Sequence, residues 1–200
     1  MQSIKNSTKF GRGLAVVMQK NIDSIESEMS IAINKLIKIK RMYQFIPECQ
    51  TNFVYSKPRP NSSMDILGLE GRIVKIGDSV MVAGGLKYGS SKHVASAVLE
   101  IARKFPYVRS ALNIRYDNKI IQNAIARGFR VSSYNRCFEP HKGKKKEGMT
   151  ISWGIRYAIE EVKIPPDIIY HKGDIGKEPM IIIFGRTPNQ VLAKLAKIIR

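Results

Sequence analysis

The sequence is short of acidic side chains: it holds 16 aspartates and glutamates against 34 lysines and arginines, for a formal net charge of +18. Such an excess favours anionic partners, such as nucleic acid, an anionic membrane surface or a phosphorylated small molecule. It does not choose among them, and a basic surface without a specific partner fits the same count.

Cysteine is scarce as well, because Cys49 and Cys137 are the only two and neither belongs to a Cys-x-x-Cys pair. This excludes a disulfide framework and the ligand spacing of a structural metal site. No apolar run approaches the length of a membrane span, and the short run 13–18 ends at Gln19 without a secretory signal. We therefore expect a cytoplasmic protein without a membrane partner.

Two familiar phosphate-binding fingerprints, the Walker A motif and G-x-G-x-x-G, are also missing. Instead, three glycines, two lysines and two serines gather in Gly84–His93, directly before a run of helix-forming residues at 94–102. The first N–H groups of a helix bind phosphate readily. An ordinary capped helix explains the segment equally well.

The alternation of apolar patterns predicts an α/β protein. Residues 1–18 are expected to be a basic, weakly ordered extension, and 19–200 a single domain that starts with an amphipathic helix at 22–42. Further helices are predicted at 94–105, 118–126, 150–162 and 188–199. Strands are predicted at 52–56, 111–116, 129–134, 168–170 and 180–184. A hairpin at 71–82, turning at Gly77-Asp78, is expected to make the main sheet mixed.

Several polar residues are candidates for chemistry. His93, in the first turn of its helix, would feel the positive end of the helix dipole, which favours neutral imidazole; a capping or packing role is the alternative. Arg72 and Arg115 lie at strand ends, where arginine can bind phosphate or only meet solvent. Trp153 could line a pocket against a flat ring, although a lone tryptophan is more often core.

Two charged loops allow alternative interpretations. Loop 171–179 combines lysines with Asp174 and Glu178, which could hold a magnesium ion beside an anion; a solvated connection is the alternative. Loop 142–146 is rich in lysine but has no interleaved aromatic residues, which favours a solvated loop over a nucleic-acid contact.

Taken together, these segments resemble the ThiN-type thiamine-phosphate synthase domain of archaea and some bacteria, which also forms the C-terminal domain of ThiDN fusion proteins. The matching motifs keep the family's order over roughly residues 22–200. They are Ile46-Pro47-Glu48, Thr51–Tyr55, Gly71-Arg72-Ile73, Tyr88–Ala95, Asn113–Tyr116, Gly128-Phe129, Ser152-Trp153-Gly154 and Gly173–Met180.

The resemblance implies a three-layer α/β/α fold with a mixed sheet, similar to the class II aldolase (AraD-like) architecture. It implies the joining of a hydroxymethylpyrimidine diphosphate to a thiazole phosphate, with release of pyrophosphate. It also implies that Arg72 and His93 are needed for synthesis. A thiamine-phosphate-sensing regulator of the same family is the alternative, and a nucleic-acid-binding module is the weakest of the three.

On that basis we assign expected roles to the site residues. Arg72 would stabilise the leaving charge, and His93 would bind phosphate or move a proton. Asp174 and Glu178 are the candidate ligands of Mg2+. The expected substrate-binding residues are Gly89, Ser90, Ser91, Lys92, Asn113, Arg115, Trp153 and Lys177. The two phosphorylated substrates are the expected partners, nucleic acid is not favoured, and the apolar face of helix 22–42 suggests a homodimer.

Overall fold

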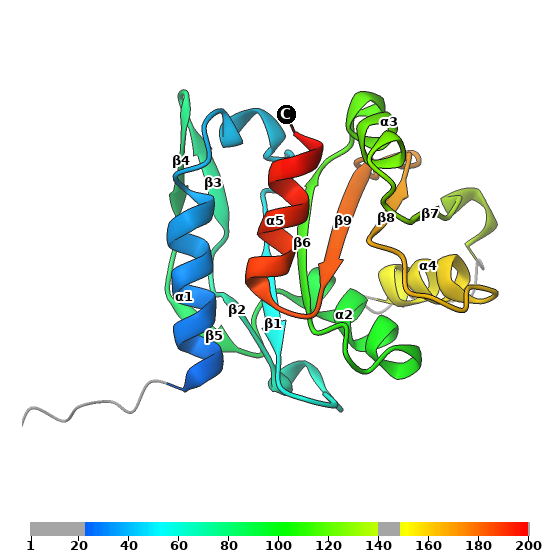
Figure 1. The fold of residues 1–200 in the computed structure, drawn as a ribbon, viewed down its shortest axis with the longest axis horizontal. Coiled ribbons are helices and arrows are strands. Elements are labelled where there is room, and N and C mark those ends of the chain that lie inside the picture. Colours follow the sequence, from blue (N-terminus) through cyan, green and yellow to red (C-terminus); the bar gives the residue numbers. More distant parts are fainter. Residues whose placement is uncertain (1–22, 140–148, 200) are drawn as a thin grey trace, which may run out of the picture.

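The computed structural model describes residues 23–139 and 149–199 (Figure 1). The expected extension 1–18 and the lysine-rich loop 142–146 lie outside this range. The helices are α1 (Ser24–Leu36), α2 (Lys92–Lys104), α3 (Asn118–Ala126), α4 (Met149–Ile159) and α5 (Pro188–Ile198), with 3-10 turns η1 (Met42–Phe45), η2 (Ser63–Asp65) and η3 (Arg136–Phe138). The strands are β1 (Phe53–Ser56), β2 (Ile66–Leu69), β3 (Ile73–Ile76), β4 (Ser79–Val82), β5 (Leu86–Tyr88), β6 (Ser110–Arg115), β7 (Val131–Ser133), β8 (Ile168–His171) and β9 (Met180–Gly185).

Local capping explains where several helices begin and end. The side chain of Asp117 accepts a hydrogen bond from the Lys119 N–H at the start of α3, and Gly128, at φ +75°, follows its end. Thr187 caps α5 in the same way, directly before Pro188 in the first turn. These signals are local, and the structure has both helices close to their predicted bounds.

Seven strands form one sheet in the order β5-β2-β1-β6-β9-β8-β7. Each neighbouring pair is antiparallel except β7–β8, which is parallel. Side chains of β9 alternate between two hydrophobic clusters: Ile181 and Ile183 belong to one, Ile182 and Phe184 to the other. A run that is apolar on both faces requires a layer of helices on each side.

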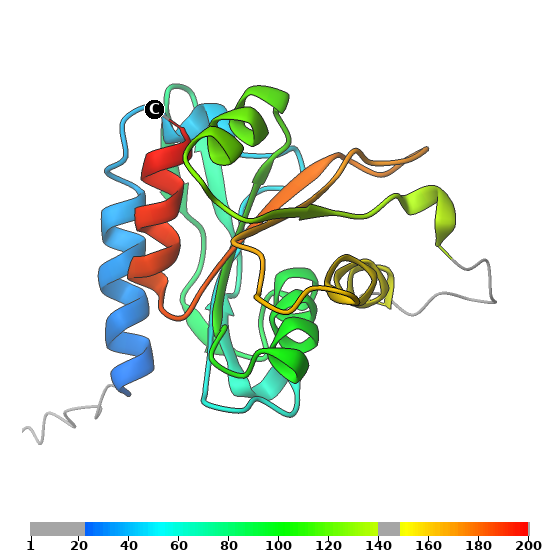
Figure 2. The same cartoon turned by 45° about the vertical axis from the view of Figure 1, so that its right-hand side comes forward.

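Those two helical layers are present (Figures 1 and 2). Helices α1, α3 and α5 cover one face, and α2 and α4 cover the other. The three-layer α/β/α expectation is thereby confirmed. The apolar face of α1 packs on α5 and β1, so it does not need a second copy of the chain, and the homodimer stays an untested prediction.

The structure corrects three details of the expected fold. The hairpin β3–β4 forms a separate two-stranded sheet. Its residues Ile73, Val80 and Val82 pack on the core, whereas Ile76 and Met81 are exposed. The main sheet is mixed through β7–β8 instead. Strands β2 and β5 were not expected, since each lies in a glycine-containing segment that reads as a turn. The first helix ends at Leu36 rather than at 42, and Arg41 has a left-handed backbone at φ +62°.

Close packing of α4 against the sheet depends on Gly154. A Cβ atom at this position would lie 2.3–2.6 Å from ring carbons of Tyr134, which is itself 4% exposed. Such a separation is far below van der Waals contact, so the helix or the ring would have to shift. Glycine at this position therefore allows α4 to approach the strand that ends at Ser133.

We predict that Gly154→Ala destabilises the protein by about 1–3 kcal/mol, because overpacking at Tyr134 outweighs the gain of at most ~1 kcal/mol in helix propensity. Urea unfolding measures the change. Ser152→Ala, at a partly buried position of the same helix, is the control and should change stability little. A Gly154→Ala protein more stable than the wild type would contradict the packing argument.

Candidate functional site

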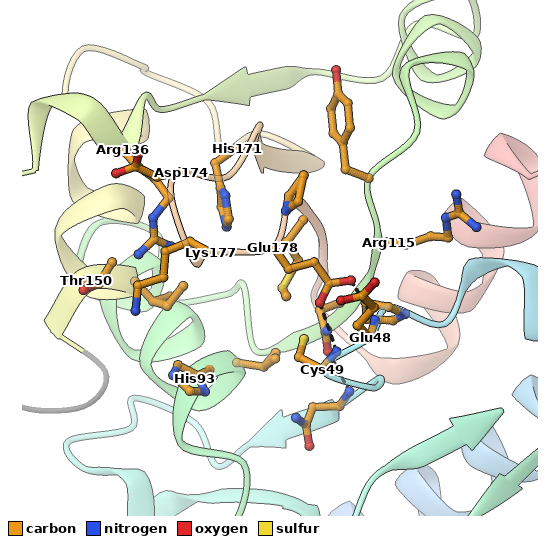
Figure 3. A pocket seen from close by; sticks show the side chains of 18 of the residues that line it. Glu48, Cys49, His93, Arg115, Arg136, Thr150, His171, Asp174, Lys177 and Glu178 are labelled. Carbon is orange, nitrogen blue, oxygen red and sulfur yellow. Dashed lines mark hydrogen bonds between the residues drawn. The ribbon is translucent and has the colours of Figure 1, made fainter.

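A cavity of about 1170 Å3 opens beside the ends of β6 and β8. Its walls come from the turn 46–49, the first turn of α2, η3, the start of α4 and the segment 171–180 (Figure 3). The lining contains more basic than acidic side chains, and it includes two histidines. A cavity with this lining can hold an anionic small molecule.

Seven of the predicted site residues line this cavity and five do not. Those that line it are Arg72, His93, Asn113, Arg115, Asp174, Lys177 and Glu178. Those that do not are Gly89, Ser90, Ser91, Lys92 and Trp153. The cavity therefore collects the residues predicted at strand ends and in loop 171–179, but not the Gly-Ser-Ser turn.

The geometry of the α2 start explains why the serines lie elsewhere. Ser91 has a left-handed backbone at φ +65°, and its Oγ is buried without a hydrogen-bond partner among the described residues. Its Cβ lies 3.2 Å from the position that a Cβ on Gly68 would take, so Ser91 packs against β2. Trp153 stacks on Tyr157, with ring centroids 5.6 Å apart.

Arg72 is held in place by a chain of contacts through Cys49. Its Nη1 donates a hydrogen bond to the Cys49 carbonyl. The N–H groups of Glu48 and Cys49 donate in turn to the two carboxylate oxygens of Glu178, at 2.7 and 2.9 Å. Figure 3 shows Glu178 reaching toward this turn. Glu178 thus fixes the turn that positions Arg72.

The Cys49 thiol belongs to the same arrangement but has no sign of nucleophilic activation. Burial, together with the neighbouring Glu178 carboxylate, raises its pKa to about 12. The thiol is therefore protonated near neutral pH, whereas the thiolate is the reactive form. Cys49 acts through its main chain.

Asn113 lies in the centre of the sheet and is 2% exposed. Its Oδ1 accepts from the Asn52 N–H at 2.6 Å, and its Nδ2 donates to the Gln50 carbonyl at 3.1 Å. Both ends of the amide are therefore used to join β6 to the segment before β1. The Oδ1 of Asn52, by contrast, is buried beside the cavity without a partner among the described residues.

His171 and Arg136 are two cavity residues that sequence reasoning did not assign. His171 is 3% exposed, and burial lowers its pKa to about 4, with a further contribution from the positive charge of Arg136. Its Nδ1 accepts a hydrogen bond from the Gly173 N–H at 3.1 Å, which assigns the ring proton to Nε2. The position of His171 at a strand end, beside a glycine-containing loop, could have marked it as a site residue. Arg136 follows β7 in an irregular segment, and nothing in the sequence marked it.

The two predicted magnesium ligands do not form a ready-made metal site. Both oxygens of Glu178 accept main-chain N–H groups, while Asp174 is exposed and accepts from the Ile175 N–H at 2.8 Å. Within residues 23–139 and 149–199, no three side chains of the His, Cys, Asp and Glu types gather as a metal-binding group. These residues do not fit a protein-held ion, and magnesium stays a prediction.

The family of the chain follows from comparison with known proteins. The model of the thiamine-phosphate synthase ThiN family matches residues 28–197. The chain belongs to the ThiN family. It is 37% identical over 155 residues to the thiamine-phosphate synthase ThiN of Methanothermobacter thermautotrophicus, covering 78% of this chain and 82% of that one.

Two further relatives agree with this family. The bifunctional thiamine biosynthesis protein ThiDN of Methanocaldococcus jannaschii is 35% identical over 177 residues, which cover 88% of this chain and 40% of that longer protein. The crystal structure of the C-terminal domain of a phosphomethylpyrimidine kinase superposes with a TM-score of 0.81 at 49% identity, covering 87% of this chain and 97% of that one. These names support a role in thiamine biosynthesis.

The wider fold resemblance is also confirmed. An aldolase II superfamily protein from Pseudomonas syringae superposes with a TM-score of 0.53 at 10% identity, covering 90% of this chain and 77% of that one. An l-fuculose-1-phosphate aldolase from Thermus thermophilus gives 0.51 at 9% identity, over 86% of this chain and 91% of that one. At these identities the likeness concerns the fold alone. Among the described residues, no helix has both the length and the apolar character needed to cross a bilayer.

We predict that Glu178→Gln destabilises the turn at Glu48 and Cys49. A glutamine amide offers one oxygen and one NH2 group, so one of the two main-chain N–H groups would meet a donor. The expected cost is about 1–3 kcal/mol in the free energy of unfolding, measured with urea. Glu161→Gln, on an exposed residue, is the matched control. Equal stability of Glu178→Gln and wild type would contradict the conclusion that the Glu178 carboxylate holds this turn in place.

We predict that His171 makes stability fall as the pH falls from about 6.5 to about 4. The lowered pKa means that the unfolded chain binds a proton in this range while the folded protein does not, so acid favours unfolding. In His171→Asn the Oδ1 can still accept from Gly173, but the titrating group is gone. Urea unfolding at pH 7 and pH 4.5 should show a smaller loss of stability for the variant; an equal loss would contradict the assignment.

Proposed function

We propose that the chain is a thiamine-phosphate synthase that joins 4-amino-2-methyl-5-hydroxymethylpyrimidine diphosphate to hydroxyethylthiazole phosphate. The products are thiamine phosphate and pyrophosphate. Membership of the ThiN family and the names of the relatives support this reaction. The observation that carries it here is that Arg72, His93 and Lys177, from three separate segments, line one cavity.

The chemistry of the reaction sets what such a cavity must supply. The thiazole nitrogen forms a bond to the methylene carbon of the pyrimidine, and the bond from that carbon to the diphosphate oxygen breaks with its electron pair on the oxygen. The electron-rich aminopyrimidine stabilises positive charge at the carbon. The protein's main tasks are to bring the nucleophile and carbon together and to stabilise the departing negative charge.

The cavity residues fit these tasks. The guanidinium of Arg72, positioned through Cys49, would bind the leaving diphosphate, with Lys177 adding positive charge. His93, in the first turn of α2 at the cavity wall, would donate a hydrogen bond to a phosphate oxygen. Arg115, at the end of β6, also lines the cavity, but its Nη1 donates to the Gln44 carbonyl at 3.3 Å and its guanidinium points away from the other labelled residues (Figure 3).

We predict that Arg72→Ala and His93→Ala each lower kcat/KM for thiamine phosphate formation by about 10²-fold or more, as expected when a charge-stabilising donor is removed. The purified protein is incubated with both phosphorylated substrates, with and without magnesium, and thiamine phosphate is measured. Arg127→Ala, on an exposed residue at the end of α3, should keep wild-type turnover.

Two outcomes would overturn this assignment. Undiminished synthesis by either variant would remove that residue's role. Absence of product from the wild type, together with tight binding of thiamine phosphate, would replace the synthase with the sensing function proposed as the alternative.

A further inference from the structure

Arg136 is a buried cation at the cavity wall. Its side chain is 6% exposed, and it is the first residue of η3, separated by two residues from the end of β7. Figure 3 shows its guanidinium on the side of the cavity formed by Thr150 and Lys177, away from Cys49 and Arg115. Arg72, which donates to the Cys49 carbonyl, belongs to that other side.

Within the described part of the chain, the guanidinium of Arg136 is only partly satisfied: it has an ion pair with Glu139 and a buried Nε without an acceptor. Its Nε is buried and has no hydrogen-bond partner there. Its Nη2 lies 3.6 Å from the Glu139 carboxylate, beyond hydrogen-bond length, and that carboxylate accepts from the Thr150 Oγ1 at 2.5 Å. A guanidinium withdrawn from water without its hydrogen bonds is costly. An anion in the cavity would supply the missing acceptors.

A second donor lies close to the same place. Because the Nδ1 of His171 accepts from Gly173, its Nε2 carries a proton that it can donate. The charge of Arg136 is close enough to disfavour protonation of this ring. A cationic fork beside a neutral N–H donor matches the oxygens of a phosphate group.

We propose that Arg136 and the Nε2–H of His171 bind a phosphate group at a subsite separate from Arg72. The inference rests on the proposed function, because that reaction requires two phosphorylated substrates. The phosphate comes either from the thiazole phosphate, in which case it stays in the product, or from the diphosphate that leaves. Arg136 is a binding residue in either case.

Calorimetric binding of thiamine phosphate, unphosphorylated thiamine and pyrophosphate tests the proposal on the whole protein. The informative quantity is the ratio of affinities for thiamine phosphate and thiamine, since general damage to the cavity would weaken both ligands together. Arg136→Met removes the charge. Arg136→Lys keeps the charge at this buried position but removes the guanidinium fork. It provides the same binding measurement if Arg136→Met does not fold. Arg127→Met is the control.

If the subsite holds the phosphate that stays in the product, both variants lower the preference for thiamine phosphate over thiamine by about tenfold or more, and they raise KM for the thiazole phosphate. If it holds the leaving group, they weaken pyrophosphate binding and raise KM for the pyrimidine diphosphate. Both results support the subsite. Wild-type affinities for thiamine phosphate and pyrophosphate in Arg136→Lys, or in Arg136→Met where it folds, would overturn it.

The two proposals can fail separately. A wild-type protein without turnover, whose phosphate-dependent binding is lost in the Arg136 variants, would remove the synthase function and leave the phosphate subsite. Turnover and ligand binding at wild-type levels in those variants would remove the phosphate subsite and leave the synthase function.

Discussion

The arrangement of the cavity depends on the carboxylate of Glu178. It accepts hydrogen bonds from two successive main-chain N–H groups in a turn 130 residues earlier in the chain. The carbonyl of the second of these residues, Cys49, accepts from Arg72. One side chain of loop 171–179 thereby links the turn 46–49 to the arginine that the proposed chemistry requires. A carboxylate used in this way contributes the geometry of the turn.

The sheet supplies the rigid frame on which these loops converge. Its central strands are buried on both faces, yet Asn113 interrupts the apolar pattern of β6 at a position 2% exposed. Two hydrogen bonds of the Asn113 side-chain amide hold the segment 50–52 against β6. Buried polar groups are tolerated when they are fully hydrogen-bonded. The cavity therefore lies at the edge of the apolar core, where the hydrogen-bonded side chain of Asn113 replaces apolar side chains.

Much of the fold could be predicted from apolar periodicity and capping, because these signals are local. The bounds of α3 and the turn at Gly77-Asp78 follow from a few neighbouring residues. Position at strand ends and loop composition made Arg72, Arg115 and loop 171–179 candidates only, and the family resemblance assigned them to the site that lines the cavity. The direction of Ser91 could not be predicted, since it depends on the approach of β2. The place of Arg136 in the cavity wall and the hydrogen-bond partners of Glu178 could not be predicted either, because both are set by packing between distant segments.

The most direct test of the account is a crystal structure of the protein grown with thiamine phosphate and pyrophosphate. The account predicts that both ligands lie in the cavity of about 1170 Å3, with one phosphate within hydrogen-bond distance of Arg136 and another near Arg72. Thiamine phosphate bound outside this cavity, or bound within it with no phosphate oxygen within hydrogen-bond distance of Arg136, would contradict the account.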